Sequence, residues 1–129
     1  MSAKVVHFEL PADNVERARA FYKKTFQWGI QPMPEMNYTM VQTTPSDENG
    51  MPKELGGING GIAARGNPSP VKVPVITISV DDIDQTLKQI GKNGGKMVQD
   101  KQSIGPMGFT AYFQDTEGNI VGLFQPPQA

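Results

Sequence analysis

Cysteine is absent from this 129-residue sequence, and histidine occurs only once. Without cysteine the chain cannot form a disulfide scaffold, a zinc finger or a thiolate cluster, and it has no cysteine nucleophile. A single histidine excludes every site that needs two imidazoles from one chain. The apolar runs are too short to span a membrane, and Lys4 leads directly into a predicted strand. We therefore expect a cytoplasmic protein without a signal peptide.

An excess of either charge is also missing. The sequence contains twelve Lys and Arg residues and thirteen Asp and Glu residues, which gives a formal net charge of −1. No basic stripe is present to follow a phosphate backbone, so we expect no nucleic-acid partner. The length fits one domain, 1–129, because domains usually contain about 100–150 residues.

The first half of the sequence predicts a strand followed by a helix. In residues 4–10, one face carries Phe8 and the other carries His7 and Glu9, because side chains alternate along a strand. Apolar residues at helical spacing then predict a helix over residues 14–26. Asp13 is the predicted N-cap, with an acidic residue three positions later as in a capping box.

The second half repeats this pattern. Residues 73–80 alternate as a strand, and the acidic run 81–84 opens a second predicted helix. A shift of 68 residues places His7 on Val75 and the acidic start of the first helix on that of the second. Strand, acidic cap and helix recur in register, which indicates an internal duplication.

Further β-strand patterns follow each predicted helix. They cover residues 38–44 and 57–64 in the first half, and 97–98, 109–114 and 120–124 in the second. Residues 115–119 have the composition of a tight hairpin turn. The connection 45–55 is polar and is expected to be mobile, and residues 65–72 form a predicted linker. Each half therefore reads as βαβββ, with modules 4–64 and 72–125.

A doubled βαβββ pattern resembles the glyoxalase / bleomycin-resistance / dioxygenase superfamily, also called vicinal oxygen chelate proteins. The first half carries the resemblance in the run from His7 to Asp13 and in Asn59-Gly60-Gly61-Ile62, and the second half carries it in 80–83 and 115–119. The nearest resemblance is to small bacterial lactoylglutathione-lyase-like members. It implies an α+β fold in which eight strands form a curled, partly open sheet with the helices outside.

The resemblance also implies where a metal ion would bind. Metal-dependent members hold a divalent ion in the cleft formed by two curled sheets, with ligands from the first and fourth strands of each half. In this sequence His7 keeps a ligand type, whereas the matching positions hold Val75, Gly122, and Asn59 or Gly60. A functional divalent site usually needs at least three protein ligands. We therefore expect no cofactor and no tightly held metal ion.

His7 and Glu9 are the candidate catalytic residues, and each has two interpretations. His7 is either a half-buried histidine inherited from a metal-binding ancestor, or a hydrogen-bond donor, general base or residual ligand. Glu9 shares its strand face, and a carboxylate in an apolar cleft costs free energy unless it is paired. Glu9 is therefore either a salt-bridged or solvated rim residue, or a catalytic base or ligand contact.

Ten further residues are predicted to line an apolar ligand pocket, although core packing would explain the large ones equally well. The glycines among them either allow the sheet to bend or leave room for a ligand. The predicted lining consists of Trp28, Met40, Asn59, Gly60, Val75, Thr77, Phe109, Tyr112, Gly122 and Phe124.

Two functions of different classes follow from the resemblance and these residues. The first is a protein of the glyoxalase/bleomycin-resistance type that binds a small, partly apolar molecule in the cleft without a metal ion. The second is a lyase or isomerase that acts on a small oxygenated substrate, with His7 or Glu9 as the base or as a residual metal ligand. The expected partner is a small molecule, and the habit of the family suggests a homodimer.

Overall fold

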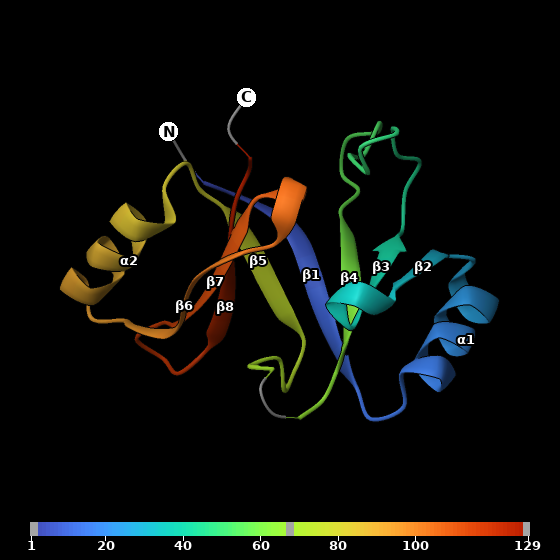
Figure 1. Ribbon diagram of the computed structural model, residues 1–129, viewed down its shortest axis with the longest axis horizontal. Helices are drawn as coiled ribbons and strands as arrows, with labels where there is room; N and C mark the ends of the chain where they lie inside the picture. The colour runs from blue at the N-terminus through green and yellow to red at the C-terminus, as the bar shows by residue number, and fades with distance from the viewer. Residues whose placement is uncertain (1–2, 67–68, 128–129) are drawn as a thin grey trace. The chain divides into compact units, whose positions relative to one another are not determined.

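The computed structural model describes residues 3–66 and 69–127 (Figure 1), so residues 67–68 of the predicted linker lie outside the described part. Within these residues two α-helices and eight strands follow one another along the chain. Strand pairing gives one mixed sheet in the order β2-β3-β4-β1-β5-β8-β7-β6, which is not closed into a barrel. The predicted fold class is therefore confirmed. The chain divides into two compact units, residues 7–74 and residues 3–6 with 75–127, which are described in turn.

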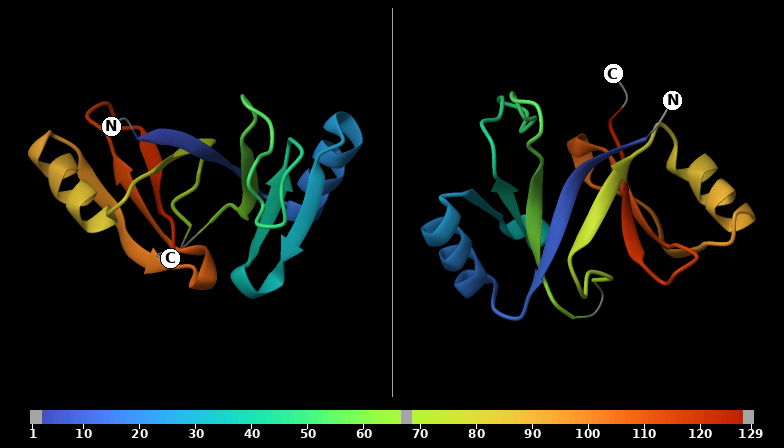
Figure 2. Two further views of the ribbon diagram at one scale, coloured as in Figure 1. Left: turned by 90° about the horizontal axis from the view of Figure 1, so that it is seen from above. Right: turned by 180° about the vertical axis from the view of Figure 1, so that it is seen from behind.

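Residues 7–74 contain most of β1 (Lys4–Ala12), α1 (Val15–Phe26), β2 (Gly29–Met33), β3 (Tyr38–Gln42) and β4 (Asn59–Ala64). A short 3₁₀ turn, Pro34–Met36, connects β2 to β3. β1 and β4 are parallel, whereas β3 is antiparallel to both β2 and β4. Figure 2 shows that α1 stays on one side of these strands in both views.

The N-cap of α1 lies one residue later than predicted. Asn14, not Asp13, is the N-cap, and its side-chain oxygen accepts a hydrogen bond from the backbone N–H of Arg17 at 2.9 Å. Asp13 instead forms an ion pair with Arg65 at 2.7 Å. Asparagine and aspartate are about equally good caps, so composition alone could not separate the two neighbours.

The sequence patterns did not predict β2. Its residues, Gly-Ile-Gln-Pro-Met, show no apolar alternation and include a glycine and a proline, which are both disfavoured in strands. Proline is tolerated on an edge strand, where its missing N–H leaves no ladder partner unpaired. β2 is such an edge strand, since it pairs with β3 alone.

The strand register separates the two faces of this unit, because directly paired residues point to the same side. Ala12, Val41 and Ile62 form the buried core on the face that α1 covers. Phe8 belongs to the same face. The opposite face carries His7 and Glu9, as the sequence predicted, together with the residues paired to them on β4 and β3.

The second unit contains β5 (Val75–Ser79), α2 (Ile83–Lys92), β6 (Lys96–Ser103), β7 (Phe109–Gln114) and β8 (Ile120–Gln125), with a 3₁₀ turn at Gly105–Met107. The predicted 115–119 hairpin is present, and Oδ1 of Asp115 accepts hydrogen bonds from the backbone N–H groups of Glu117 and Asn119. The core on the α2 side contains Ile83, Ala111 and Leu123.

The two units share one topology. β1 pairs with β4 in parallel, and β5 pairs with β8 in the same way. The 68-residue shift also holds for the caps, because Asp82 accepts a hydrogen bond from the N–H of Gln85 as Asn14 does from Arg17. On the fourth strands the predicted match is wrong by one residue. Glu9 pairs with Gly61 and Thr77 pairs with Gly122, so Gly61 rather than Gly60 corresponds to Gly122.

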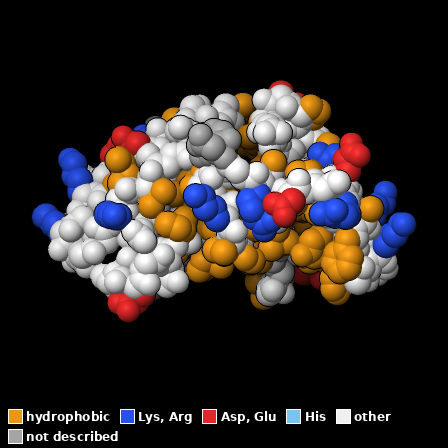
Figure 3. Space-filling view, turned by 90° about the horizontal axis from the view of Figure 1, so that it is seen from below, with side chains coloured by type: hydrophobic (Ala, Val, Ile, Leu, Met, Phe, Trp, Pro, Cys, Tyr) orange, Lys and Arg blue, Asp and Glu red, His pale blue; other side chains and the backbone are white. Residues whose placement is uncertain are grey.

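The surface seen in Figure 3 has no large patch of one charge. Lys and Arg side chains are scattered on this face among acidic and apolar ones. Within residues 3–66 and 69–127, no helix has the length and apolar character that crossing a membrane requires.

Candidate functional site

His7 lies on β1 beside the phenol of Tyr38, the first residue of β3. The Nε2 atom of His7 is 3.1 Å from the hydroxyl oxygen of Tyr38, and both side chains are half-buried. The two rings are nearly parallel, with an interplanar angle of 22° and a centroid distance of 6.5 Å. In one tautomer of neutral His7 the Nε2 atom accepts the phenolic hydrogen, and in the other it donates to the phenolic oxygen.

The neighbourhood of His7 favours the neutral imidazole. Burial lowers the pKa of His7 below its ordinary value of 6.5, and the negative charge of Glu9 offsets only part of that effect. His7 is therefore uncharged at neutral pH. An uncharged imidazole can take up a proton, which is the property that a general base requires.

Glu9 is the most deeply buried acidic residue of this face, with 7% of its surface exposed. It lies two residues beyond His7 on the same strand face and pairs directly with Gly61 on β4. Gly61 in turn pairs with Met40 on β3. The face therefore brings together His7, Glu9 and Met40 from the predicted site, and the solvated-rim interpretation of Glu9 is wrong.

Tyr38 and Gly61 were not among the predicted site residues. A Cβ atom at Gly61 would overlap the hydroxyl end of the Tyr38 ring, so the phenol fills the room that the glycine leaves. Gly61 is the second glycine of Asn59-Gly60-Gly61, and Tyr38 opens a predicted strand. Their pairing could have been inferred only from the register of β3 against β4, which the sequence does not contain.

Asn59 shares the face of His7 but has a structural role there. Its side-chain oxygen accepts a hydrogen bond from the N–H of Thr43, and its amide nitrogen donates to Ser46 and to the carbonyl of Gly50. These bonds fasten the 43–52 segment, which follows β3, to the first residue of β4. Since both ends of the amide are hydrogen-bonded within the protein, Asn59 holds this loop in place.

The side chains present do not fit the divalent metal ion that the fold family implies. The Asn59 amide is hydrogen-bonded within the protein, and Val75 and Gly122 offer no side-chain ligand atom. Across residues 3–66 and 69–127, no three His, Cys, Asp or Glu side chains gather into a possible metal site. His7 thus lacks the two further protein ligands that a stable site needs.

In the second unit, five predicted lining residues share one face, opposite the α2 core. Thr77 pairs with Gly122, and Gly122 pairs with Tyr112 on the other side. Val75 and Phe124 lie two residues from Thr77 and Gly122 on their strands and so point to the same side. The prediction that these residues face His7 and Glu9 remains a prediction.

The room expected beside Gly122 is partly filled. A Cβ atom at Gly122 would lie 2.8 Å from Oγ1 of Thr77, so the threonine side chain already borders that position. This side of β8 is therefore closer packed than the predicted gap for a ligand.

Three predicted lining residues lie on the helix-covered faces instead. Gly60 lies against Phe8, whose carbonyl oxygen would be 2.5 Å from a Cβ atom at that position. Trp28 stacks on Tyr22 of α1 with ring centroids 4.8 Å apart. Phe109 packs on the α2 core. Trp28 and Phe109 thus pack on the helix-covered sides, and Gly60 points away from the face that carries His7.

The titration of His7 gives a direct test of this site. Because the folded-state pKa lies below 6.5, the unfolded chain binds the proton more readily, and the free energy of unfolding should fall as the pH drops below about 6.5. The sequence has only one histidine, so its imidazole NMR signal is unambiguous. We expect a titration midpoint below 6.5 in the native protein. His7→Gln should remove this part of the loss in stability between pH 7.5 and 5.5. A native titration midpoint at or above 6.5 would contradict the lowered pKa of His7.

Comparison with known proteins identifies the family. A sequence profile described as "Bleomycin resistance protein-like N-terminal" matches residues 4–44. A "Glyoxylase-like domain-containing protein" from Didymella fabae is 32% identical over 130 residues, which cover 98% of this chain and 97% of that protein. The chain belongs to the glyoxalase/bleomycin-resistance/dioxygenase superfamily.

Solved structures show the same glyoxalase-like fold at low sequence identity. A hypothetical protein from Bacillus halodurans C-125 superposes with a TM-score of 0.67 at 14% identity, covering 100% of this chain and 98% of that chain. Methylmalonyl-CoA epimerase from Mycobacterium tuberculosis gives 0.65 at 11% identity, covering 96% and 88%. A superfamily member from Vibrio splendidus 12B01 gives 0.60 at 12% identity, covering 96% and 99%. The fold of this glyoxalase-like protein is thus shared widely.

Proposed function

We propose that this glyoxalase-like protein binds a small, partly apolar molecule through the His7–Tyr38–Glu9 group, without a metal ion. The observation that carries the proposal is the hydrogen bond between Nε2 of His7 and the hydroxyl of Tyr38, two residues along β1 from the buried carboxylate of Glu9. Small-molecule sites combine a few convergent polar groups with apolar side chains, and Met40 supplies apolar surface on the same face.

Each polar group has a defined part in this binding. The neutral imidazole and the phenol can each donate or accept a hydrogen bond, so they suit a ligand oxygen or nitrogen. The Glu9 carboxylate accepts only, and it forms its strongest bond with a cationic donor. The ligand we expect therefore carries an apolar body and a polar end, with a preference for a protonated amine near Glu9.

A thermal-shift screen of small metabolites and drugs tests the proposal. For compounds that stabilise the wild type, Tyr38→Phe should weaken binding by about 2–10-fold, because one hydrogen bond contributes about 0.5–1.5 kcal/mol net. Glu9→Gln should weaken the binding of cationic compounds more than that of neutral ones. The matched control is Tyr22→Phe, which removes the same hydroxyl from the aromatic cluster beside Trp28 on the opposite face. If hits bind all three variants equally, the ligand site lies elsewhere.

Catalysis is the second candidate function, and it is favoured by the burial of His7, which lowers the pKa of the imidazole and suits it to accept a proton. A lyase or isomerase of the lactoylglutathione-lyase-like type would use His7 or Glu9 to remove a proton from a small oxygenated substrate. The epimerases that share the fold act on methylmalonyl-CoA, which marks acyl thioesters as the first compounds to try. Incubation of each hit in D₂O, followed by NMR, should show deuterium entering next to a carbonyl with wild type but not with His7→Gln.

Elemental analysis tests our proposal that the protein has no functional metal site. After dialysis against Zn²⁺, Ni²⁺, Mn²⁺ or Fe²⁺, we expect much less than one ion per chain, because valine and glycine occupy two of the family's ligand positions. One tightly held ion per chain that disappears in His7→Ala would contradict the proposal and would make Glu9 the next ligand to examine.

The proposal includes a cytoplasmic homodimer. The absence of cysteine is compatible with the reducing cytosol, and the dimer follows the habit of the superfamily. Sedimentation of the purified protein over a range of concentrations measures the oligomeric state.

A further inference from the structure

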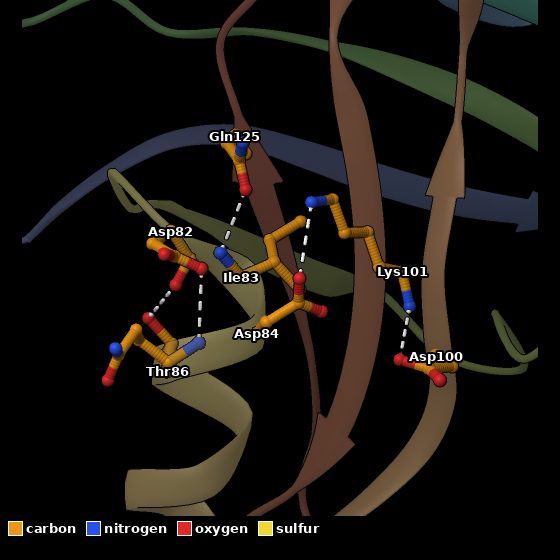
Figure 4. A network of polar contacts seen from close by, with 8 residues as sticks. Asp82, Ile83, Asp84, Thr86, Asp100, Lys101 and Gln125 are labelled. Atoms are coloured by element: carbon orange, nitrogen blue, oxygen red, sulfur yellow. Dashed lines mark hydrogen bonds and ion pairs between the residues drawn. The ribbon is translucent and has the colours of Figure 1, made fainter.

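A β-bulge in β6 sets the direction of Lys101. Gln99 pairs with Tyr112 and Gln102 pairs with Thr110, so β6 advances three residues while β7 advances two. Bulges re-aim side chains and are frequent next to functional sites. Here the bulge turns Lys101 to the α2 side, where its ammonium nitrogen lies 3.3 Å from Oδ2 of Asp84. Figure 4 shows these two groups facing each other.

Gln125 presents a second donor on the same side. Its side-chain oxygen accepts a hydrogen bond of 2.9 Å from the backbone N–H of Ile83, which fixes the orientation of the amide (Figure 4). Only 6% of the residue is exposed. No described residue accepts a hydrogen bond from its Nε2 atom. Among the described residues, every fully buried polar side-chain atom has a hydrogen-bond partner. The Nε2 atom is therefore not completely shielded from solvent.

Lys101 and Gln125 both line an open cavity of about 480 Å³ within the second unit. Its polar lining comes from Lys101 and Gln125, and its apolar lining from Phe109 and Pro127. The Lys101 ammonium lies 4.6 Å from the centre of the Phe109 ring, which places the charge beside an apolar wall. Because Phe109 packs on the α2 core, the cavity opens on the helix side of β7 and β8 and not on the Thr77–Tyr112 face.

We propose that this cavity is a second binding site and that it takes a small carboxylic acid with an apolar ring. The two polar side chains that line it both carry donors, because the Gln125 oxygen is already bonded to Ile83, and the Lys101 donor is cationic, so the matching ligand group is an anionic acceptor. The Phe109 ring and Pro127 provide the surface for an apolar body, as in most small-molecule sites. The site shares no residue with the His7–Tyr38–Glu9 group and does not rest on the function proposed for it.

In this arrangement the carboxylate of Asp84 pairs with the Lys101 ammonium, the same group that would bind the carboxylate of the ligand. The Asp84 carboxylate is 62% exposed and holds Lys101 by a single contact, so a ligand anion can compete for the ammonium at small cost. Removing the charge of Asp84 should therefore strengthen ligand binding, whereas removing the charge of Lys101 should weaken it. These opposite effects distinguish a ligand site from a purely structural ion pair.

Benzoate is the probe, with benzamide and benzylammonium as uncharged and cationic analogues. In ¹H–¹⁵N NMR titrations of the wild type, benzoate should cause saturable shifts at Gly105, Gly108 and the side-chain NH₂ of Gln125, and the two analogues should bind at least about 10-fold more weakly. Lys101→Met keeps most of the aliphatic stem and should weaken benzoate about 10-fold or more. Asp84→Asn should tighten it several-fold.

Lys88→Met, which removes an exposed lysine of α2, is the control and should leave benzoate binding unchanged. The proposal is overturned if benzoate causes no saturable shift at these groups at concentrations up to tens of millimolar, or if Lys101→Met binds benzoate as the wild type does. Asp84→Asn gives an independent test where Lys101→Met fails to fold, since unchanged or weaker binding would also overturn the proposal.

Discussion

Leucine at position 60 should abolish stable folding, and alanine at the same position should lower the free energy of unfolding by about 1–3 kcal/mol. The first added carbon would lie 2.5 Å from the carbonyl oxygen of Phe8 and 2.6 Å from its ring, so the parallel β1–β4 ladder would have to move. Urea denaturation of Gly60→Ala measures the loss, and the soluble yield of Gly60→Leu gives the extreme case.

Gly61→Ala is the matched control for Gly60→Ala, because the two neighbours point to opposite faces. At Gly61 the obstacle is the hydroxyl end of the Tyr38 side chain, which can rotate away. We expect a smaller loss of stability, together with a changed titration of His7, whose hydrogen bond to Tyr38 would be broken. Equal destabilisation with an unchanged His7 titration would contradict the assignment of these faces.

Leu123→Ala should lower the free energy of unfolding by about 2–5 kcal/mol. Only 2% of Leu123 is exposed, and it packs with Ile83 and Ala111 in the core that α2 covers. The removed carbons would leave a cavity that these neighbours cannot fully close. Thermal and urea denaturation measure the effect.

Val98→Ala provides the comparison for Leu123→Ala, since Val98 lies on the edge strand β6 and is 40% exposed. Substitutions at such positions usually change stability by less than about 0.5 kcal/mol. A loss at Val98 that matches the loss at Leu123 would mean that the α2 side of β8 is not the core of this unit.

Local chemistry made much of the fold predictable. Alternation in β1 correctly placed His7 and Glu9 opposite Phe8, because the two-residue period of a strand does not depend on its neighbours. The 115–119 hairpin followed from aspartate and glycine at the turn positions. The edge strand β2 was missed because its residues carry no such period.

The sequence by itself determined the duplicated βαβββ pattern, the superfamily and the face on which His7 and Glu9 lie. Only the tertiary structure decided that Gly61, not Gly60, belongs to that face, and that Tyr38 fills the room beside it. It also decided that Asn59 fastens a loop. The physical reason is that periodicity is a property of one strand, whereas register joins two strands, and a shift of one residue moves every side chain to the other face.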